Sequence, residues 1–134
     1  MKHKKIFMSS TAINEEKTIS QIQSTLSYYG ITAVLIDYRD GRIEALSFKI
    51  NGMPFTLPCR WKAVLKFIPN EDKARRVAWR QVFRWVQAQC AMCDIGMVQI
   101  DEVFLPYAQV KPGLTFYEHL KNNGSNLLSY EAKL

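Results

Sequence analysis

A chain of 134 residues that is 48% hydrophobic and 22% charged can form one globular domain, and this composition excludes disorder over most of its length. Its apolar runs are far shorter than the roughly 20 residues that cross a bilayer, so we expect no membrane partner. The formal net charge of +6 favours a nucleic acid or another anionic partner.

The first segment, residues 1–13, is predicted to be a flexible basic arm. Its lysines are followed by an apolar patch that is too short for a signal peptide. The chain has three cysteines, an odd number, and without an export signal the reducing cytoplasm is the expected location.

A first helix is predicted between Asn14 and Gly30. Asn14 is a good N-cap, two glutamates follow it in the first turn, and Gly30 suits the C-terminal end. The apolar residues between them recur at helical spacing and form one face: Ile19, Ile22, Leu26 and Tyr29.

Two hairpin signals, Asp40-Gly41 and Asn51-Gly52, follow this helix. Each is typical of a two-residue type I′ turn, in which both central residues need a positive φ. Two such turns predict three cross-strand rows: Leu35, Leu46 and Leu57; Ala33, Phe48 and Phe55; Ile31, Ile50 and Met53. All these residues fall on one face, so the pattern predicts a three-stranded meander over residues 31–58 with one apolar layer.

The second half of the chain is predicted to be mainly helical. A short helix over residues 60–67 precedes a long one over residues 71–92, which Asn70 caps and Gly96 closes. A short element follows over residues 101–107, and capping-box spacing from Thr115 to Glu118 predicts a final helix that ends near residue 124. Residues 125–134 are expected to form a flexible tail. The predicted fold is α+β: one domain over residues 14–124, with a three-stranded antiparallel meander packed on one face by the long helix and by the N- and C-terminal helices.

A stripe of arginines is the main functional signal. Arg76, Arg80 and Arg84 are four residues apart and share one face of the long helix, and Lys73 lies on the same stripe. Like charges at this spacing cost about 0.2–0.5 kcal/mol per pair, so something should compensate for them. Arginine binds phosphate through its planar guanidinium, and an i, i+4 ladder advances about 6 Å per step, which suits an extended single strand. The alternative is a solvated helix face whose acids come from other elements.

Aromatic and further basic residues extend this hypothesis. Trp79 and Phe83 lie at the margin of the helix's apolar arc, so they are its only plausible base-stacking residues, although the core is the better interpretation for both. Lys49 is one of several cations that extend the patch, together with Arg60, Lys62 and Lys66. The predicted nucleic-acid interface contains Lys73, Arg76, Arg80, Arg84, Lys49 and Trp79.

The cysteines and acids suggest other chemistry. Cys90 and Cys93 have redox-motif spacing, but they lie at the helix C-terminal end, where the dipole opposes a reactive thiolate. A zinc site with Cys59 would need a histidine, and only His3 and His119 exist, so buried free cysteines are the better interpretation and no metal or cofactor is predicted.

The predicted register places Asp37 opposite Glu44, with Arg39 opposite Arg42 just beyond. Two facing carboxylates could hold a divalent metal for phosphodiester cleavage. The alternative is a solvent-exposed group of four charges that neutralise one another.

Several short strings resemble a family of small proteins encoded by phages and prophages: Ala45-Leu-Ser-Phe48, Leu57-Pro-Cys-Arg-Trp61, Arg76-Val-Ala-Trp-Arg80 and Glu102-Val-Phe-Leu-Pro-Tyr107. The resemblance covers residues 14 to about 120, assigns no activity and implies the cytoplasm of a bacterial host cell. The order of a helix, a three-stranded meander and a long helix is also similar to the core of Rad52-type single-strand annealing proteins. That second resemblance implies a homo-oligomer and a strand held in a basic groove.

The leading hypothesis is a non-enzymatic nucleic-acid-binding protein of a phage or mobile element, which binds or anneals single strands in replication or recombination. The alternative is a protein-interaction module, in which the basic stripe of a phage-encoded inhibitor or adaptor docks on an acidic host protein. A metal-dependent nuclease is a minor third hypothesis.

Overall fold

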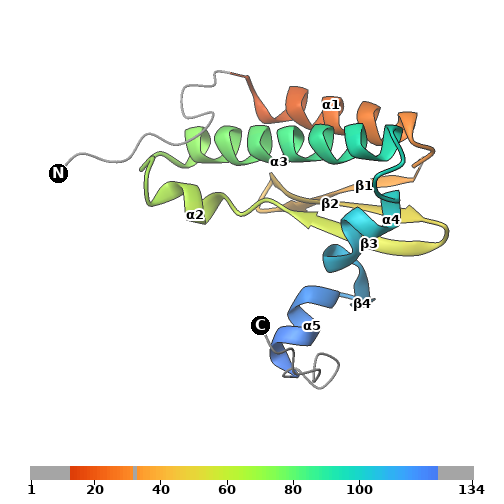
Figure 1. Ribbon diagram of the computed structural model, residues 1–134. Coiled ribbons are helices and arrows are strands. Elements are labelled where there is room, and N and C mark those ends of the chain that lie inside the picture. Colours follow the sequence, from red (N-terminus) through yellow and green to blue (C-terminus); the bar gives the residue numbers. More distant parts are fainter. Residues whose placement is uncertain (1–12, 32, 124–134) are drawn as a thin grey trace, which may run out of the picture.

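The computed structural model describes residues 13–31 and 33–123 and has the predicted α+β architecture (Figure 1). Strands β1 (Val34–Arg39), β2 (Arg42–Ile50) and β3 (Met53–Pro58) form an antiparallel sheet in the order β1-β2-β3. Helices α1 (Glu15–Tyr28) and α3 (Glu71–Asp94) lie together on one face of this sheet. The predicted tail, and the predicted arm up to residue 12, lie outside the described residues.

The remaining elements lie around the third strand and the end of α3. A short helix, α2, packs beside α3, and the chain after α3 turns back toward β3. These elements are α2 (Trp61–Leu65), α4 (Ile100–Phe104), η1 (Leu105–Tyr107), β4 (Gln109–Lys111), β5 (Leu114–Thr115) and α5 (Phe116–Asn122). The small β4–β5 hairpin was not predicted, and Ala108 just before it forms a bridge with Phe55 of β3.

The helix caps form as their sequences predict. Asn14 accepts a hydrogen bond from the backbone N–H of Lys17, and Asn70 accepts one from the backbone N–H of Lys73. A capping box joins Thr115 and Glu118 at the start of α5. These bonds satisfy N–H groups that have no partner within the first helical turn.

Both hairpin turns have the backbone geometry that the sequence predicts. Asp40 and Gly41 have φ values of 52° and 78°, and the Asn-Gly turn has φ values of 50° and 79°. The second turn also sets the register correctly, because Leu46 pairs with Leu57 and Phe48 pairs with Phe55.

The predicted register between β1 and β2 is wrong beyond the first two pairs. Arg39 pairs with Arg42 as expected, but Glu44 is an extra residue on β2, and from there Asp37 pairs with Ala45. This β-bulge shifts the pairing by one residue, and such a shift moves every later side chain to the other face. Leu35, which was predicted to be core, is therefore 64% exposed, while Ile36 is half-buried against the core.

The spacing of the apolar residues of α3 predicts a buried arc of Ala74, Val77, Ala78, Val82, Trp85, Val86 and Met92, and the observed buried arc is rotated from it. Trp79 and Phe83, which were placed at the margin, are buried, whereas Val82 and Trp85 are only half-buried. Trp79 is fully buried, with 0% exposure. The face that was expected to point toward solvent is therefore partly covered by another element, which is α1.

Helices α1 and α3 run parallel to one another (Figure 1). Arg42 contacts Glu15 at the start of α1 and Asp72 at the start of α3. Farther along both helices, Arg80 of α3 contacts Gln21 of α1. The two helices thus begin at the same end of the domain, and this arrangement decides the environment of the arginine stripe.

Candidate nucleic-acid interface

The central arginine of the stripe, Arg80, lies between α1 and α3. Its side chain is 3% exposed, and Nη1 donates hydrogen bonds to Gln21 Oε1 at 2.5 Å and to Thr18 Oγ1 at 3.4 Å. The guanidinium also stacks on the Phe83 ring at 4.8 Å. Burial, together with the positive charge of Arg84, lowers the pKa of Arg80. The prediction that Arg80 reaches solvent to hold a phosphate is therefore wrong, because α1 covers it.

The other members of the stripe keep access to solvent in different degrees. Lys73 and Arg84 are exposed, and Arg76 is half-buried. Arg84 donates a hydrogen bond to Gln87 Oε1 at 2.8 Å, one turn further along the same helix. The stripe is therefore two exposed cations and one half-buried cation, interrupted by a buried guanidinium.

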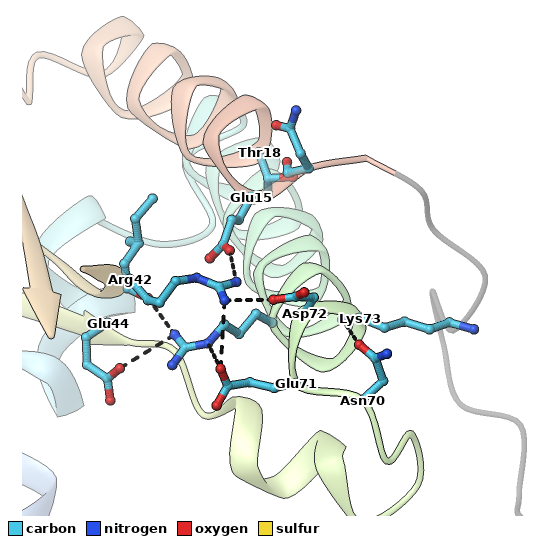
Figure 2. Close-up of polar contacts among 11 residues, drawn as sticks. Glu15, Thr18, Arg42, Glu44, Asn70, Glu71, Asp72 and Lys73 are labelled. Atoms are coloured by element: carbon cyan, nitrogen blue, oxygen red, sulfur yellow. Dashed lines mark hydrogen bonds and ion pairs between the residues drawn. The ribbon is translucent and has the colours of Figure 1, made fainter. Parts of the chain in front are cut away.

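A charge cluster gathers at the end of the domain where both helices begin (Figure 2). Arg42 of β2 contacts Glu15, lies 2.7 Å from Asp72 Oδ1, and lies 3.8 Å from Glu71 Oε2. The acids belong to the first turns of α1 and α3, where the helix dipoles also favour negative charge. Arg42 therefore ties the two helix starts to the first residue of β2.

A second arginine completes this cluster. Arg75 is buried, with Nε 3.6 Å from Glu71 Oε2 and Nη1 3.8 Å from Glu44 Oε2. Its guanidinium stacks over the Trp61 ring at 4.4 Å and donates a hydrogen bond to the carbonyl of Ile43. Arg75 thus joins α3 to the bulged strand and to α2.

The cluster leaves the stripe without acids. Every ion pair among the described residues involves Arg42 or Arg75. In residues 13–31 and 33–123, no carboxylate lies within 4 Å of the charged atoms of Arg76, Arg80 or Arg84. Figure 2 shows the Lys73 side chain extending away from Glu71 and Asp72. Among the described residues, the paired acids therefore lie at the charge cluster and not along the stripe, and burial of Arg80 interrupts the row of exposed cations.

The other residues of the predicted interface do not adjoin this surface. Trp79 is fully buried, so it cannot stack on a base. Lys49 is exposed on β2, opposite Pro54, while the stripe lies on the helical layer. The interpretation of Trp79 as a core residue is correct.

The acid pair behind the nuclease hypothesis does not form. The bulge at Glu44 places Asp37 opposite Ala45, where its carboxylate accepts a 2.7 Å hydrogen bond from Ser47. Glu44 instead reaches Arg75. In the part of the chain that the structure describes, no three histidine, cysteine or acidic residues are grouped to hold a metal ion.

The cysteines are free thiols on packed elements. Cys59 and Cys90 are buried, and Cys93 is half-buried. Burial raises the pKa of Cys59 to about 12 and that of Cys90 to about 11. Burial also raises the pKa of Cys93. Such thiols are poor nucleophiles at neutral pH, which disfavours a redox role.

A cleft of about 340 Å³ lies between α2 and α3, and no sequence pattern predicted it. Trp85 and Tyr107 line it, with Ala63 on the α2 side and Arg60 also lining it. The helical spacing of Trp85 matches the apolar arc of α3 and predicts a core position, whereas the side chain is half-exposed at the cleft. The sequence signal nearest to this cleft is the group of cations in residues 60–66, which precedes the helix that carries Trp85.

No family model, curated protein or solved structure matches this chain, so both resemblances noted from the sequence stay predictions. Within the described residues, no helix is long and apolar enough to cross a membrane.

Proposed function

We propose that this protein binds nucleic acid without catalysing a reaction, and that it holds the phosphate backbone on the outer surface of its helical layer. The cations of this surface are Lys73, Arg76 and Arg84 of α3, together with Lys17, which is exposed on α1. Lys17 lies one turn before Gln21, the residue that binds Arg80, so α1 contributes to the same layer. We call these four cations the helical basic surface.

One observation supports the proposal above all others. Among the described residues, the acids that form ion pairs form them with Arg42 or Arg75 and not with the cations of the helical basic surface. The net charge of the chain is +6. Cations that lack carboxylate partners are free to exchange their counterions for phosphates, and this exchange drives non-specific nucleic-acid binding.

Arg80 has a supporting role in this proposal. Its hydrogen bonds to Gln21 and Thr18 fix α1 against α3, so they hold the cations of the two helices in one surface. Arg80 is therefore a positioning residue, and phosphate contact falls to its exposed neighbours. Single-strand binding or annealing for a phage or mobile element remains our proposal for the biological setting.

The test is fluorescence anisotropy with a labelled 30-nucleotide single strand and the matching duplex, each at 50 and 200 mM salt. We expect replacement of Lys73, Arg76 and Arg84 by alanine to weaken binding at least about tenfold and to reduce the salt slope by about two to three charges. The matched control replaces Arg39, Lys111 and Lys121, three exposed cations elsewhere, and changes the net charge equally.

Two outcomes would contradict the proposal. Binding by the stripe variant that equals wild type would remove the helical basic surface from consideration. Equal weakening in the control variant would mean that net charge alone, and no particular surface, attracts the nucleic acid.

The second candidate is the protein-interaction module, in which the same cations dock on an acidic protein. The edge strand β1 favours this candidate, because two of its own apolar side chains, Leu35 and Tyr38, are 64% and 63% exposed. Competition with poly-glutamate separates the two candidates. If the surface binds nucleic acid, an oligonucleotide should displace poly-glutamate at a much lower concentration than poly-glutamate needs to displace the oligonucleotide. If the surface docks on an acidic protein, poly-glutamate should be the stronger competitor.

A further inference from the structure

The cleft between α2 and α3 has the features of a ligand site. Its volume is about 340 Å³, which is within the range of small-molecule pockets, and most of its lining is apolar. Ala63 and Val64 line it from α2, and Ala78 and Val82 line it from α3. The cleft combines this apolar lining with a cation, Arg60.

Aromatic side chains form one wall of the cleft. Trp85 packs edge-on against Tyr107, with ring centroids 5.8 Å apart, and against Phe104, with ring centroids 5.5 Å apart. These two contacts fix the indole, and the half-exposed remainder of Trp85 lines the cleft. A fixed half-exposed aromatic ring offers a stacking surface to a planar ligand at little entropic cost.

Positive charge borders the cleft on the α2 side. Arg60 lines it directly before α2, and Lys66 follows directly after α2, three residues beyond Ala63. Both cations are exposed, and no described carboxylate lies within 4 Å of either, although the charge of Arg60 helps to lower the pKa of nearby Glu118. Lys62, by contrast, stacks over Trp61 at 5.8 Å, on a ring that does not line the cleft.

We propose that this cleft binds a nucleobase against Trp85 and Tyr107, with the phosphate of that nucleotide held by Arg60 and Lys66. An apolar slot with an aromatic wall suits the base, and the exposed cations at the two ends of α2 suit the phosphate. The inference rests on the proposed function when the nucleotide belongs to a strand. A free mononucleotide has the same chemistry, so the experiment must separate these two sources.

The experiment follows the indole N–H signal of Trp85 by NMR, assigned with Trp85→Phe, and measures affinity in parallel. The probes are adenosine 5′-monophosphate, adenosine, ribose 5-phosphate and a dA₁₂ oligonucleotide. We expect the monophosphate and the oligonucleotide to shift the Trp85 signal, and the two fragments to bind more weakly than the intact nucleotide. An acetylated Glu-Phe-Glu peptide tests the competing chemistry of an acidic aromatic peptide.

Three variants locate the site. Ala63 is exposed, so Ala63→Trp should fill the cleft without disturbing the core and reduce affinity about tenfold, which is the order of one stacked base. Lys66→Glu should weaken binding several-fold more than its charge-matched control, Lys62→Glu. Arg60→Ala, checked for folding by circular dichroism, provides a second cleft variant if Ala63→Trp fails to fold.

The outcomes separate this inference from the proposed function. Oligonucleotide binding that Ala63→Trp and Arg60→Ala leave unchanged would overturn the cleft and spare the helical basic surface. Monophosphate binding in the cleft without oligonucleotide binding would support the base site and overturn the proposed function. Peptide binding in the absence of any nucleotide-induced shift would overturn the base site.

Discussion

Arg80 donates a 2.5 Å hydrogen bond to the side-chain oxygen of Gln21, across the interface between the two parallel helices. Its partners, Gln21 and Thr18, are neutral, so its charge is compensated by dipoles and by the Phe83 ring. A guanidinium in such a site contributes packing and hydrogen bonds to stability, and this origin can be tested.

Replacing Arg80 by alanine should lower the free energy of unfolding by about 1–3 kcal/mol, because it removes buried hydrogen bonds and leaves a void. Arg80→Met keeps a long unbranched side chain and removes the buried charge, so it should lower the free energy of unfolding by less than Arg80→Ala does. Arg84→Ala is the control on the same stripe and should lie within about 0.5 kcal/mol of wild type. Urea denaturation measures all three, and equal losses for Arg80→Ala and Arg84→Ala would show that Arg80 is not buried.

The charge cluster predicts a salt-dependent loss. Arg42→Ala should destabilise the fold by about 1–2 kcal/mol at low salt, since it leaves Glu15, Glu71 and Asp72 close together without their shared cation. Arg42 is about one third exposed, so the difference from wild type should shrink at 0.5 M salt. Arg39→Ala removes the like charge directly opposite and should be neutral or slightly stabilising. A loss at Arg42 that does not change with salt would mean that packing, and not charge, is responsible.

The β-bulge at Glu44 predicts which residue of β1 matters for the core. Ile36→Ser should cost about 1–2 kcal/mol because Ile36 packs against the core, while Leu35→Ser should change stability by less than about 0.5 kcal/mol. Thermal or chemical denaturation of the two variants decides the register. A larger loss for Leu35→Ser than for Ile36→Ser would mean that β1 and β2 pair in the regular register that the turn predicts, without the bulge at Glu44.

The thiol of Cys59 predicts a loss of stability at high pH. Its pKa is near 9 in the unfolded chain, and burial raises it to about 12 in the folded protein. The folded state therefore holds the proton more tightly, so this contribution is fully present below pH 9 and is lost as the pH rises toward 12. The stability difference between wild type and Cys59→Ala should change over that window. Tyr29, whose hydrogen bond with Asp94 raises its pKa to about 12, and Cys90 titrate in both proteins and cancel in the comparison. A difference that does not vary with pH would contradict the buried thiol.

Local signals in the sequence were sufficient for the elements and their ends. Asn14 and Asn70 cap their helices, and the turns at Asp40-Gly41 and Asn51-Gly52 have the predicted backbone conformation. Each of these depends on neighbours within a few residues. The register of β2 with β3 followed, because no residue intervenes to change the count set by the turn.

The errors came from contacts between distant segments. Glu44 is the bulged residue and has no partner on β1. Its carbonyl accepts a hydrogen bond from the N–H of Cys59, and its carboxylate lies near Arg75. No pattern around the first turn contains that information. Likewise, helical spacing correctly put the three arginines of the stripe on one face, but it could not show that α1 would lie over Arg80. The proposed helical basic surface therefore contains the cations that α1 leaves open to solvent and excludes Arg80.

The meander between α1 and α3 has three strands, an odd number, so its last strand ends at the end of the domain where α1 begins. Helix α3 therefore starts at that same end. This parity makes α3 follow the direction of α1, and it separates their touching residues widely in sequence: Arg80 and Thr18 are 62 positions apart. Loops of that length close slowly and at an entropic cost. Helix pairing should consequently be a late event in folding, after the local hairpins, and the helical basic surface, whose cations come from both helices, would be completed only then.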